Sequence, residues 1–195
     1  PPISTLFPYT TLFRSTSAAD VQKAMAFAAA HNLKVAPRSG GHSYIGASTA
    51  NGAMVLDLRQ LPGDANYDAA TGQVTVTPAT SLYTMHRTLA AAGRGVPTGT
   101  CPSVGAAGHA LGGGLGAQSR HAGLLCDQLT SASVVLPNGQ AVTASAANNP
   151  DLFWALRGRA RAPAPAAGLR RHDADRGVPG DDAGAARRDR GEAGS

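Results

Sequence analysis

The stretch Arg38-Ser39-Gly40-Gly41-His42-Ser43-Tyr44 decides how this sequence is interpreted. It directly follows residues 33–37, a short segment that we expect to be extended. Two adjacent glycines let backbone N–H groups approach a ligand without obstruction by a Cβ atom, as anion-binding loops require. Arg38 adds a guanidinium that can form charge-assisted hydrogen bonds with phosphate. Taken alone, the stretch is equally compatible with a polar surface turn that contains a hydrogen-bonded histidine.

A second glycine-rich run occupies residues 100–116, with the sequence Thr-Cys-Pro-Ser-Val-Gly-Ala-Ala-Gly-His-Ala-Leu-Gly-Gly-Gly-Leu-Gly. Such a run can wrap its backbone closely around a flat or phosphorylated cofactor. It matches the dinucleotide-binding fingerprint poorly, because no clear strand precedes its glycines and no acidic residue follows at the required offset. One glycine-rich run alone is weak evidence of a cofactor site, and the pair of glycine-rich stretches is much more specific.

The flanking segments predict a mixture of helices and strands. Ser17 and Asp20 fit a capping box at the start of a helix that leaves at His31 and Asn32, and Thr80 or Ser81 can cap another. An Asn-Gly pair between two apolar runs predicts a hairpin. The expected strands are residues 33–37, 54–58, 74–77, 133–136 and 140–143, and the further expected helices are residues 82–89 and 150–156. This mixture indicates an α+β fold.

Four motifs in order along the chain resemble the berberine-bridge-enzyme-like family, within the broader vanillyl-alcohol-oxidase and p-cresol-methylhydroxylase flavoprotein fold. They are Arg-Ser-Gly-Gly-His-Ser-Tyr at 38–44, Cys-Pro-Ser-Val-Gly at 101–105, Gly-His-Ala-Leu-Gly-Gly-Gly-Leu-Gly at 108–116 and Asn-Pro-Asp-Leu-Phe-Trp-Ala-Leu-Arg-Gly at 149–158. The resemblance runs from about Ser17 to Gly158. It implies an FAD-binding domain of the p-cresol-methylhydroxylase type that is incomplete at its C-terminal end.

The resemblance also implies how FAD would be held. In many members the histidine of the first loop bonds to the 8α-methyl group of FAD, and the cysteine of the second loop bonds to ring carbon C6. His42 and Cys101 occupy those positions, which implies bicovalent attachment; imidazole nitrogen and thiolate are suitable nucleophiles. The residues expected to hold FAD are Arg38, Ser39, Gly40, Gly41, His42, Ser43, Cys101, Val104, Gly105, Gly108, His109, Gly112, Gly113, Gly114 and Val142.

The function implied is that of an FAD-dependent oxidoreductase. It would accept hydride from a small-molecule CH–OH or related donor and pass electrons to dioxygen or another acceptor. The family's usual tyrosine base lies beyond the region of resemblance, so no catalytic residue is assigned. The alternative is a non-catalytic FAD-binding fragment without a substrate domain.

The remaining cysteine and histidines have simpler interpretations. Cys126 is expected to be a buried structural residue, because free cysteine often packs as a small hydrophobe. Two cysteines are too few for a disulfide framework, and the alternative of one disulfide between them is left open. The spacing of His42, His109 and His121 matches no compact metal motif, so we expect no metal.

Both ends of the chain differ in character from residues 17–158. Residues 1–16 lack a helical or strand pattern, and we expect them to be disordered. Residues 159–195 are rich in Ala, Gly, Arg and Pro, with Leu169 and Val178 as their only large aliphatic side chains. Such a segment cannot bury enough surface to offset the cost of ordering it, so disorder is predicted there too. Because its residues have GC-rich codons, we hypothesise an out-of-frame translation after Gly158, which the coding DNA can test.

The net charge of +5 does not indicate a nucleic-acid-binding protein. Residues 159–195 contain eight arginines but also six acidic residues, so no block of one sign is present. An arginine-rich nucleic-acid-binding tail is therefore the weaker alternative. No apolar run has the length of a membrane span, and the first residues show no signal-peptide pattern. We expect a small-molecule substrate and neither a nucleic-acid nor a membrane partner; the oligomeric state and compartment are not indicated.

Overall fold

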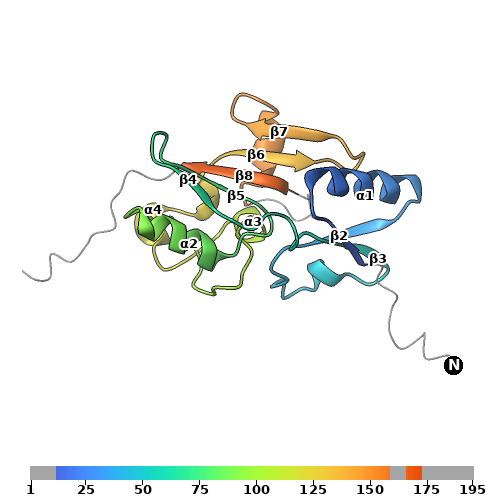
Figure 1. Cartoon of the computed structure of the whole chain (residues 1–195), viewed down its shortest axis with the longest axis horizontal. Coiled ribbons are helices and arrows are strands. Elements are labelled where there is room, and N and C mark those ends of the chain that lie inside the picture. The colour runs from blue at the N-terminus through green and yellow to red at the C-terminus, as the bar shows by residue number, and fades with distance from the viewer. Residues whose placement is uncertain (1–11, 159–165, 173–195) are drawn as a thin grey trace, which may run out of the picture.

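A computed structural model describes residues 12–158 and 166–172 of the chain. In this part of the chain the strands form two sheets that lie next to each other, with helices packed around them (Figure 1). The first sheet is parallel and has the order β1-β3-β2, with β1 at Leu12–Arg14, β2 at Lys34–Arg38 and β3 at Ala53–Asp57. The second is antiparallel and has the order β4-β5-β8-β6-β7, with β4 at Asn66–Asp68, β5 at Gln73–Val76, β6 at Leu129–Val135, β7 at Ala141–Ser145 and β8 at Ala166–His172.

Helix α1 (Ala18–Ala30) covers the first sheet and begins at the predicted capping box. The Ser17 hydroxyl accepts a hydrogen bond from the Asp20 backbone N–H at 3.2 Å, and the Asp20 carboxylate accepts one from the Ser17 N–H at 3.1 Å. The apolar face that the sequence predicts is buried against β3 and the end of β6, where Leu56 and Val135 are fully enclosed. The predicted exit is confirmed, because the helix ends at Ala30.

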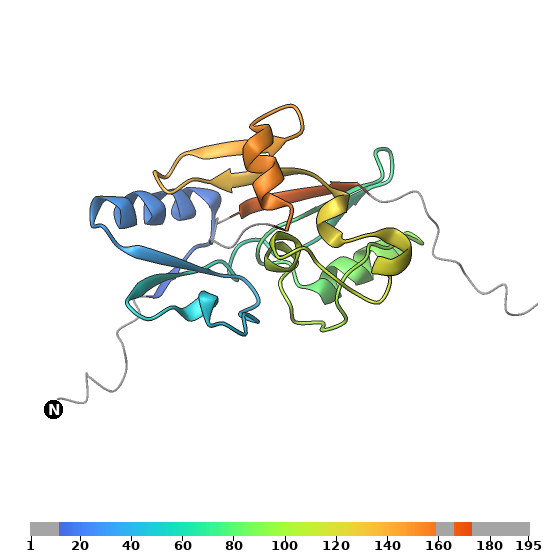
Figure 2. The same ribbon diagram turned by 180° about the vertical axis from the view of Figure 1, so that it is seen from behind.

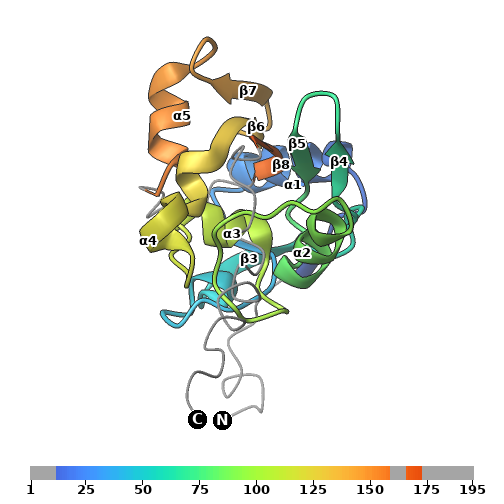
Figure 3. The same ribbon diagram turned by 90° about the vertical axis from the view of Figure 1, so that its left-hand side faces the viewer.

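The second sheet has the larger core, which it shares with several helices (Figures 2 and 3). Met85 and Leu89 of α2 pack there with Val74 and Val76 of β5. The Ser81 hydroxyl caps α2 by accepting from the Thr84 N–H at 3.1 Å. The helices are α2 at Leu82–Ala91, α3 at Ala106–Leu111, α4 at Ser119–Ala122 and α5 at Pro150–Leu156, with short 3-10 turns η2 at Ala47–Thr49 and η3 at Leu125–Gln128. None of the helices among these described residues is long and apolar enough to cross a membrane.

The predicted hairpin is confirmed between β6 and β7. Val135 pairs with Ala141 across the turn, and the Leu136 N–H donates to the Gln140 carbonyl at 2.8 Å. Gly139 has a φ of +83°, a backbone conformation that side chains disfavour. The Asn-Gly pair therefore forms the turn of the hairpin, as the sequence pattern predicts.

The structure corrects the prediction of disorder at two places. Residues Leu12–Arg14, within the segment 1–16, form β1 in parallel pairing with β3. Residues Ala166–His172, within the segment 159–195, form β8 between β5 and β6. Pairing with a distant strand satisfies the backbone N–H and C=O groups of a segment that has no hydrophobic periodicity of its own. Amino-acid composition does not reveal this stabilisation. The other residues of both segments lie outside the described part of the chain.

Short elements with little sequence pattern were not predicted. Strand β4 has three residues, and α3 has six, mostly small ones, after Gly105, which provides no side-chain cap. Such elements depend on their neighbours for stability, because a short helix is marginal by itself. The α3 segment was expected to be part of a glycine-rich loop and is instead a helix held against the core through Ala106, Ala107 and Ala110.

A buried carboxylate stabilises the end of the first sheet, where the loop after Arg38 begins. Asp57 pairs with Arg38 in the β2–β3 register, and its side chain is 2% exposed. The Arg59 guanidinium forms a bidentate pair with this carboxylate, with Nε at 2.9 Å from Oδ1 and Nη2 at 2.5 Å from Oδ2. These side-chain hydrogen bonds hold the pKa of Asp57 below its ordinary value.

Replacing Arg59 with methionine is expected to lower the free energy of unfolding by about 1–3 kcal/mol near neutral pH, because a buried carboxylate loses its charged side-chain partner and keeps only the backbone N–H of residue 59. A carboxyl group whose pKa is lowered by folding stabilises the fold above its unfolded-state pKa, and this contribution is lost as the pH falls through the folded-state value. The difference between wild type and variant should therefore shrink below about pH 4. Urea denaturation at several pH values in this range measures the difference in free energy of unfolding, with Arg59→Lys as an intermediate control. An undiminished difference in acid would contradict the prediction.

Candidate functional site

The first glycine-rich loop leaves the carboxyl end of β2, where it is bonded to neighbouring segments, and is closed by a hydrogen bond of its own. The Arg38 carbonyl accepts from the Leu58 N–H at 2.9 Å, and the Ser39 hydroxyl donates to the Pro78 carbonyl. Gly41 has a φ of +77°, which permits the sharp change of direction before His42. The loop closes where the Ser43 hydroxyl accepts from the Ala47 N–H at 3.1 Å. These contacts hold His42 on an exposed turn between fixed points.

The second loop is fastened to the start of α2. The Tyr83 N–H donates to the Pro102 carbonyl at 3.1 Å, and the Leu82 N–H donates to the Val104 carbonyl at 2.8 Å. These carbonyls lie on either side of Ser103. The backbone on both sides of Ser103 is therefore fixed by the first turn of a helix in the main core.

The two loops meet at a pair of glycines. A Cβ atom on Gly40 would lie 2.5 Å from the Gly105 backbone nitrogen, and one on Gly105 would lie 2.8 Å from the Gly40 nitrogen and 1.8 Å from the Ser39 Oγ. Distances this short are far inside van der Waals contact. Only glycine at both positions lets the backbones touch, so these residues join the two loops that the sequence separates by about sixty positions.

A cavity of about 460 Å³ opens along this junction. It brings together most of the residues predicted to hold FAD. The predicted residues that line it are Ser39, Gly40, Gly41, His42, Ser43, Cys101, Val104, Gly105, Gly108 and His109. Pro37, Tyr44 and Ser48 also line it and were not predicted. Tyr44 belongs to the quoted motif, whereas nothing in the sequence pattern singles out Ser48.

Arg38 lies directly behind this lining. A Cβ atom on Gly41 would be 3.2 Å from the Arg38 Nε, so the guanidinium packs against the loop backbone. This Nε is buried and has no hydrogen-bond partner among the described residues. Buried donors are nearly always paired, so an unpaired one beside a cavity indicates that an acceptor belongs there. A phosphate oxygen fits this requirement.

The remaining predicted residues lie away from the cavity lining. Gly113 and Gly114 have positive φ angles, and their carbonyls accept from the N–H groups of Cys126 and Leu125 in η3 at 3.0 and 3.1 Å. Gly112 ends helix α3. Val142 pairs with Val134 in the second sheet and packs on the main core. In this structure these glycines dock one segment against another, which is a packing arrangement that sequence alone does not distinguish from ligand binding.

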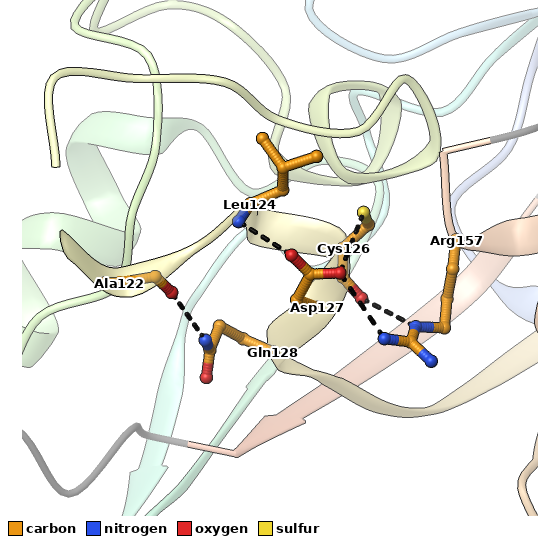
Figure 4. A network of polar contacts seen from close by, with 6 residues as sticks. All are labelled: Ala122, Leu124, Cys126, Asp127, Gln128 and Arg157. Atoms are coloured by element: carbon orange, nitrogen blue, oxygen red, sulfur yellow. Dashed lines mark hydrogen bonds and ion pairs between the residues drawn. The ribbon is translucent and has the colours of Figure 1, made fainter. Parts of the chain in front are cut away.

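A polar network joins the last motif, at residues 149–158, to the segment around η3 (Figure 4). The Arg157 Nε donates to the Cys126 carbonyl at 3.1 Å, and its Nη2 lies 3.5 Å from the Asp127 carboxylate. The same carboxylate accepts from the Leu124 N–H at 2.9 Å. Gly158, with a φ of +83°, then passes next to Gly113, where an added Cβ would lie 3.3 Å from the Gly113 Cα. Arg157 thus binds η3, and Gly158 brings the last motif against the glycine-rich run.

The two cysteines occupy different surroundings, and both are free thiols. Cys101 is exposed at the cavity. Cys126 is buried, and burial together with the nearby Asp127 carboxylate raises the pKa of its thiol. A thiol kept protonated is a poor nucleophile, so Cys126 fits the packing role that the sequence predicts.

The histidines do not converge on a metal. The described residues contain no group of three His, Cys, Asp or Glu side chains that could hold an ion. The His109 Nε2 accepts from the Gly99 N–H at 2.8 Å, which fixes the ring at the edge of the cavity. His42 faces Ser103 instead, with Nε2 at 2.9 Å from the hydroxyl oxygen.

Comparison with known proteins identifies the fold around this cavity. The sequence profile of the family described as "FAD binding domain" matches residues 10–145. The chain belongs to this family of FAD-binding domains. The match begins before Leu12, which agrees with the strand found there, and it confirms the predicted α+β FAD-binding fold and the binding of FAD.

The individual relatives agree with that family. Xylooligosaccharide oxidase from Thermothelomyces thermophilus is 41% identical over 162 residues, which is 80% of this chain and 32% of the relative. Glucooligosaccharide oxidase from Acremonium strictum, whose structure is described as containing "6-s-cysteinyl, 8 alpha-N1-histidyl FAD", superposes with a TM-score of 0.77 at 30% identity, covering 83% of this chain and 34% of that one. BBE-like 1 from Physcomitrella patens superposes with a TM-score of 0.77 at 35% identity, covering 84% and 36%.

These likenesses confirm the predicted resemblance to berberine-bridge-enzyme-like flavoproteins. They also show how much of such a protein the chain represents. It spans about a third of the length of the curated relatives it matches. The comparisons therefore support an FAD-linked oxidoreductase by family and leave the activity of the whole protein to be proposed.

Proposed function

We propose that this chain is the cofactor-holding part of an FAD-linked oxidoreductase and that FAD is attached to both His42 and Cys101. The observation on which this depends is that the two side chains, 59 positions apart in the sequence, line one cavity on loops that touch at Gly40 and Gly105. The linkages named for the glucooligosaccharide oxidase structure, through one cysteine and one histidine, support the same pairing here.

The residues present fit the demands of FAD. The glycine junction leaves backbone exposed along a cavity where side chains would obstruct a ligand. The buried, unpaired Nε of Arg38 offers a donor for the pyrophosphate, next to backbone N–H groups of the loop at Ser39–Ser43. Gly105, Gly108 and His109 would line the flavin side.

Each covalent bond replaces one hydrogen on the protein atom and one on the flavin carbon. His42 loses a ring proton and Cys101 its thiol proton, and the two electrons released for each bond pass to dioxygen, which becomes hydrogen peroxide. The chain's contribution is to place both nucleophiles at the cofactor in advance. When bound, FAD supplies the ability to accept a hydride.

The proposed hydride donor is a small molecule with a CH–OH group, and the name of the xylooligosaccharide oxidase supports an oligosaccharide. No catalytic base is assigned among the described residues. A second candidate is the non-catalytic FAD-binding unit that the sequence also allows. Turnover of an oligosaccharide by the purified chain would decide against that candidate.

The experiment is to express the 195-residue chain, denature it and measure intact mass together with fluorescence in a denaturing gel. We expect one FAD per chain to survive denaturation, because covalent bonds resist conditions that release a bound cofactor. FAD that binds but is fully released on denaturation would leave the domain assignment in place and overturn covalent attachment.

A further inference from the structure

The Ser103 hydroxyl lies between the two proposed attachment residues. Its oxygen is 2.9 Å from the His42 Nε2 and 3.7 Å from the Cys101 Sγ. A serine hydroxyl can accept a hydrogen bond and donate one at the same time. One side chain is therefore placed to interact with both nucleophiles.

The His42 tautomer determines the direction of these hydrogen bonds, and one arrangement satisfies both contacts with the Cys101 sulfur as the acceptor. A neutral imidazole has one nitrogen that carries hydrogen and one that has a lone pair. If the His42 Nε2–H donates to Ser103, the serine hydrogen can point to the Cys101 sulfur, and both contacts are satisfied together. The His42 Nδ1, which has no hydrogen-bond partner in the described part of the chain, then has the free lone pair.

We propose that Ser103 is a positioning residue for flavin attachment: it selects the His42 tautomer with hydrogen on Nε2, and so presents Nδ1 as the nucleophile, while its own hydrogen orients Cys101. This inference rests on the proposed covalent attachment. It assigns to Ser103 the part that an orienting group plays beside other activated nucleophiles.

The placement of Ser103 supports such a role. The carbonyls of its neighbours Pro102 and Val104 accept from the first turn of α2, which fixes the backbone on both sides. The Ser103 carbonyl would be only 2.7 Å from a Cβ on Gly40, so it also touches the loop that carries His42. The backbone that carries the exposed Ser103 hydroxyl is thus held by two structural elements, and a hydrogen bond to a group on a fixed backbone orients a histidine better than one to a mobile group.

The first test needs no cofactor. In the full chain prepared without flavin and labelled with 15N-histidine, NMR distinguishes the two imidazole tautomers. We expect wild type to show His42 with hydrogen on Nε2 and a lone pair on Nδ1. Ser103→Ala should give a mixture of tautomers, Ser103→Thr should restore the wild-type pattern because it retains the hydroxyl, and Ser133→Ala, an exposed serine on β6, should change nothing.

The second test measures attachment to histidine alone. In a Cys101→Ala background, covalent FAD is followed over time after FAD is added to the flavin-free chain. We expect Ser103→Ala to slow attachment about fivefold, as loss of one ordinary hydrogen bond worth ~1 kcal/mol would, and Ser103→Thr to recover the rate.

The outcomes separate the two proposals. If wild type attaches no FAD covalently, the proposed attachment fails, while the tautomer measurement still tests Ser103. If attachment occurs and Ser103→Ala leaves both the tautomer and the rate unchanged, the inference about Ser103 is wrong. A slow Ser103→Ala variant that Ser103→Thr does not rescue would likewise overturn it.

Discussion

Replacing His42 and Cys101 together with alanine is expected to remove all FAD that survives denaturation. These are the two proposed attachment residues, both of which line the cavity, whereas Cys126 is buried and burial raises the pKa of its thiol. Each single variant should retain one FAD through the remaining residue, because one bond suffices to hold the cofactor through denaturation. Intact mass gives the stoichiometry for all three variants.

Peptide mapping sharpens the test. Cleavage after Lys and Arg leaves His42 on the peptide 39–59 and Cys101 on the peptide 95–120. In wild type we expect these two peptides to be joined through FAD as one species. In His42→Ala only 95–120 should carry flavin, and in Cys101→Ala only 39–59.

Matched controls for this experiment are Cys126→Ala and His121→Ala, which remove a cysteine or a histidine that does not line the cavity. Both should retain the joined peptides. Full FAD mass on the double variant, or flavin on any peptide other than these two, would show that the attachment residues are assigned wrongly.

Replacing Gly105 with alanine is expected to destabilise the chain and separate the two loops. The added Cβ would collide with the Gly40 nitrogen at 2.8 Å and the Ser39 Oγ at 1.8 Å, and a backbone atom cannot rotate away as a side chain can. Overpacking of this kind costs about 1–3 kcal/mol, and we expect the upper end of that range. Urea denaturation of the flavin-free chain measures the loss of stability, and FAD titration measures the loss of binding.

Gly108→Ala is the matched control for stability. Gly108 lies inside helix α3, and nothing lies within 4 Å of an added Cβ there. Alanine should therefore stabilise the helix by about 0.4–1 kcal/mol. Adding Ser39→Gly to Gly105→Ala should recover only part of the loss, because the clash with the Gly40 backbone remains. If Gly105→Ala were as stable as wild type, the close contact between the loops would be wrong.

The sequence predicted the elements that have local causes. The capping box at Ser17 and Asp20, the Ser81 cap and the hairpin at Asn138 and Gly139 appear where their patterns place them. Each depends on hydrogen bonds or backbone angles within a few residues, so a short window contains the whole reason for the structure. Strands β1 and β8 could not be predicted in this way, because their stability comes from partners far along the chain.

The candidate site shows the same difference between features with local causes and features that depend on distant contacts. The sequence by itself determined which chemical groups are available: two glycine-rich stretches, an arginine, and a histidine and a cysteine at the positions where the family resemblance implies flavin attachment. Only the tertiary structure decided that Gly40 and Gly105 touch, that Gly113 and Gly114 dock η3 outside the cavity lining, and that Ser103 lies between His42 and Cys101. The physical reason is that these contacts join distant segments or join one backbone to another. The packing of β2 and α2 on their cores fixes them, and no local sequence pattern records them.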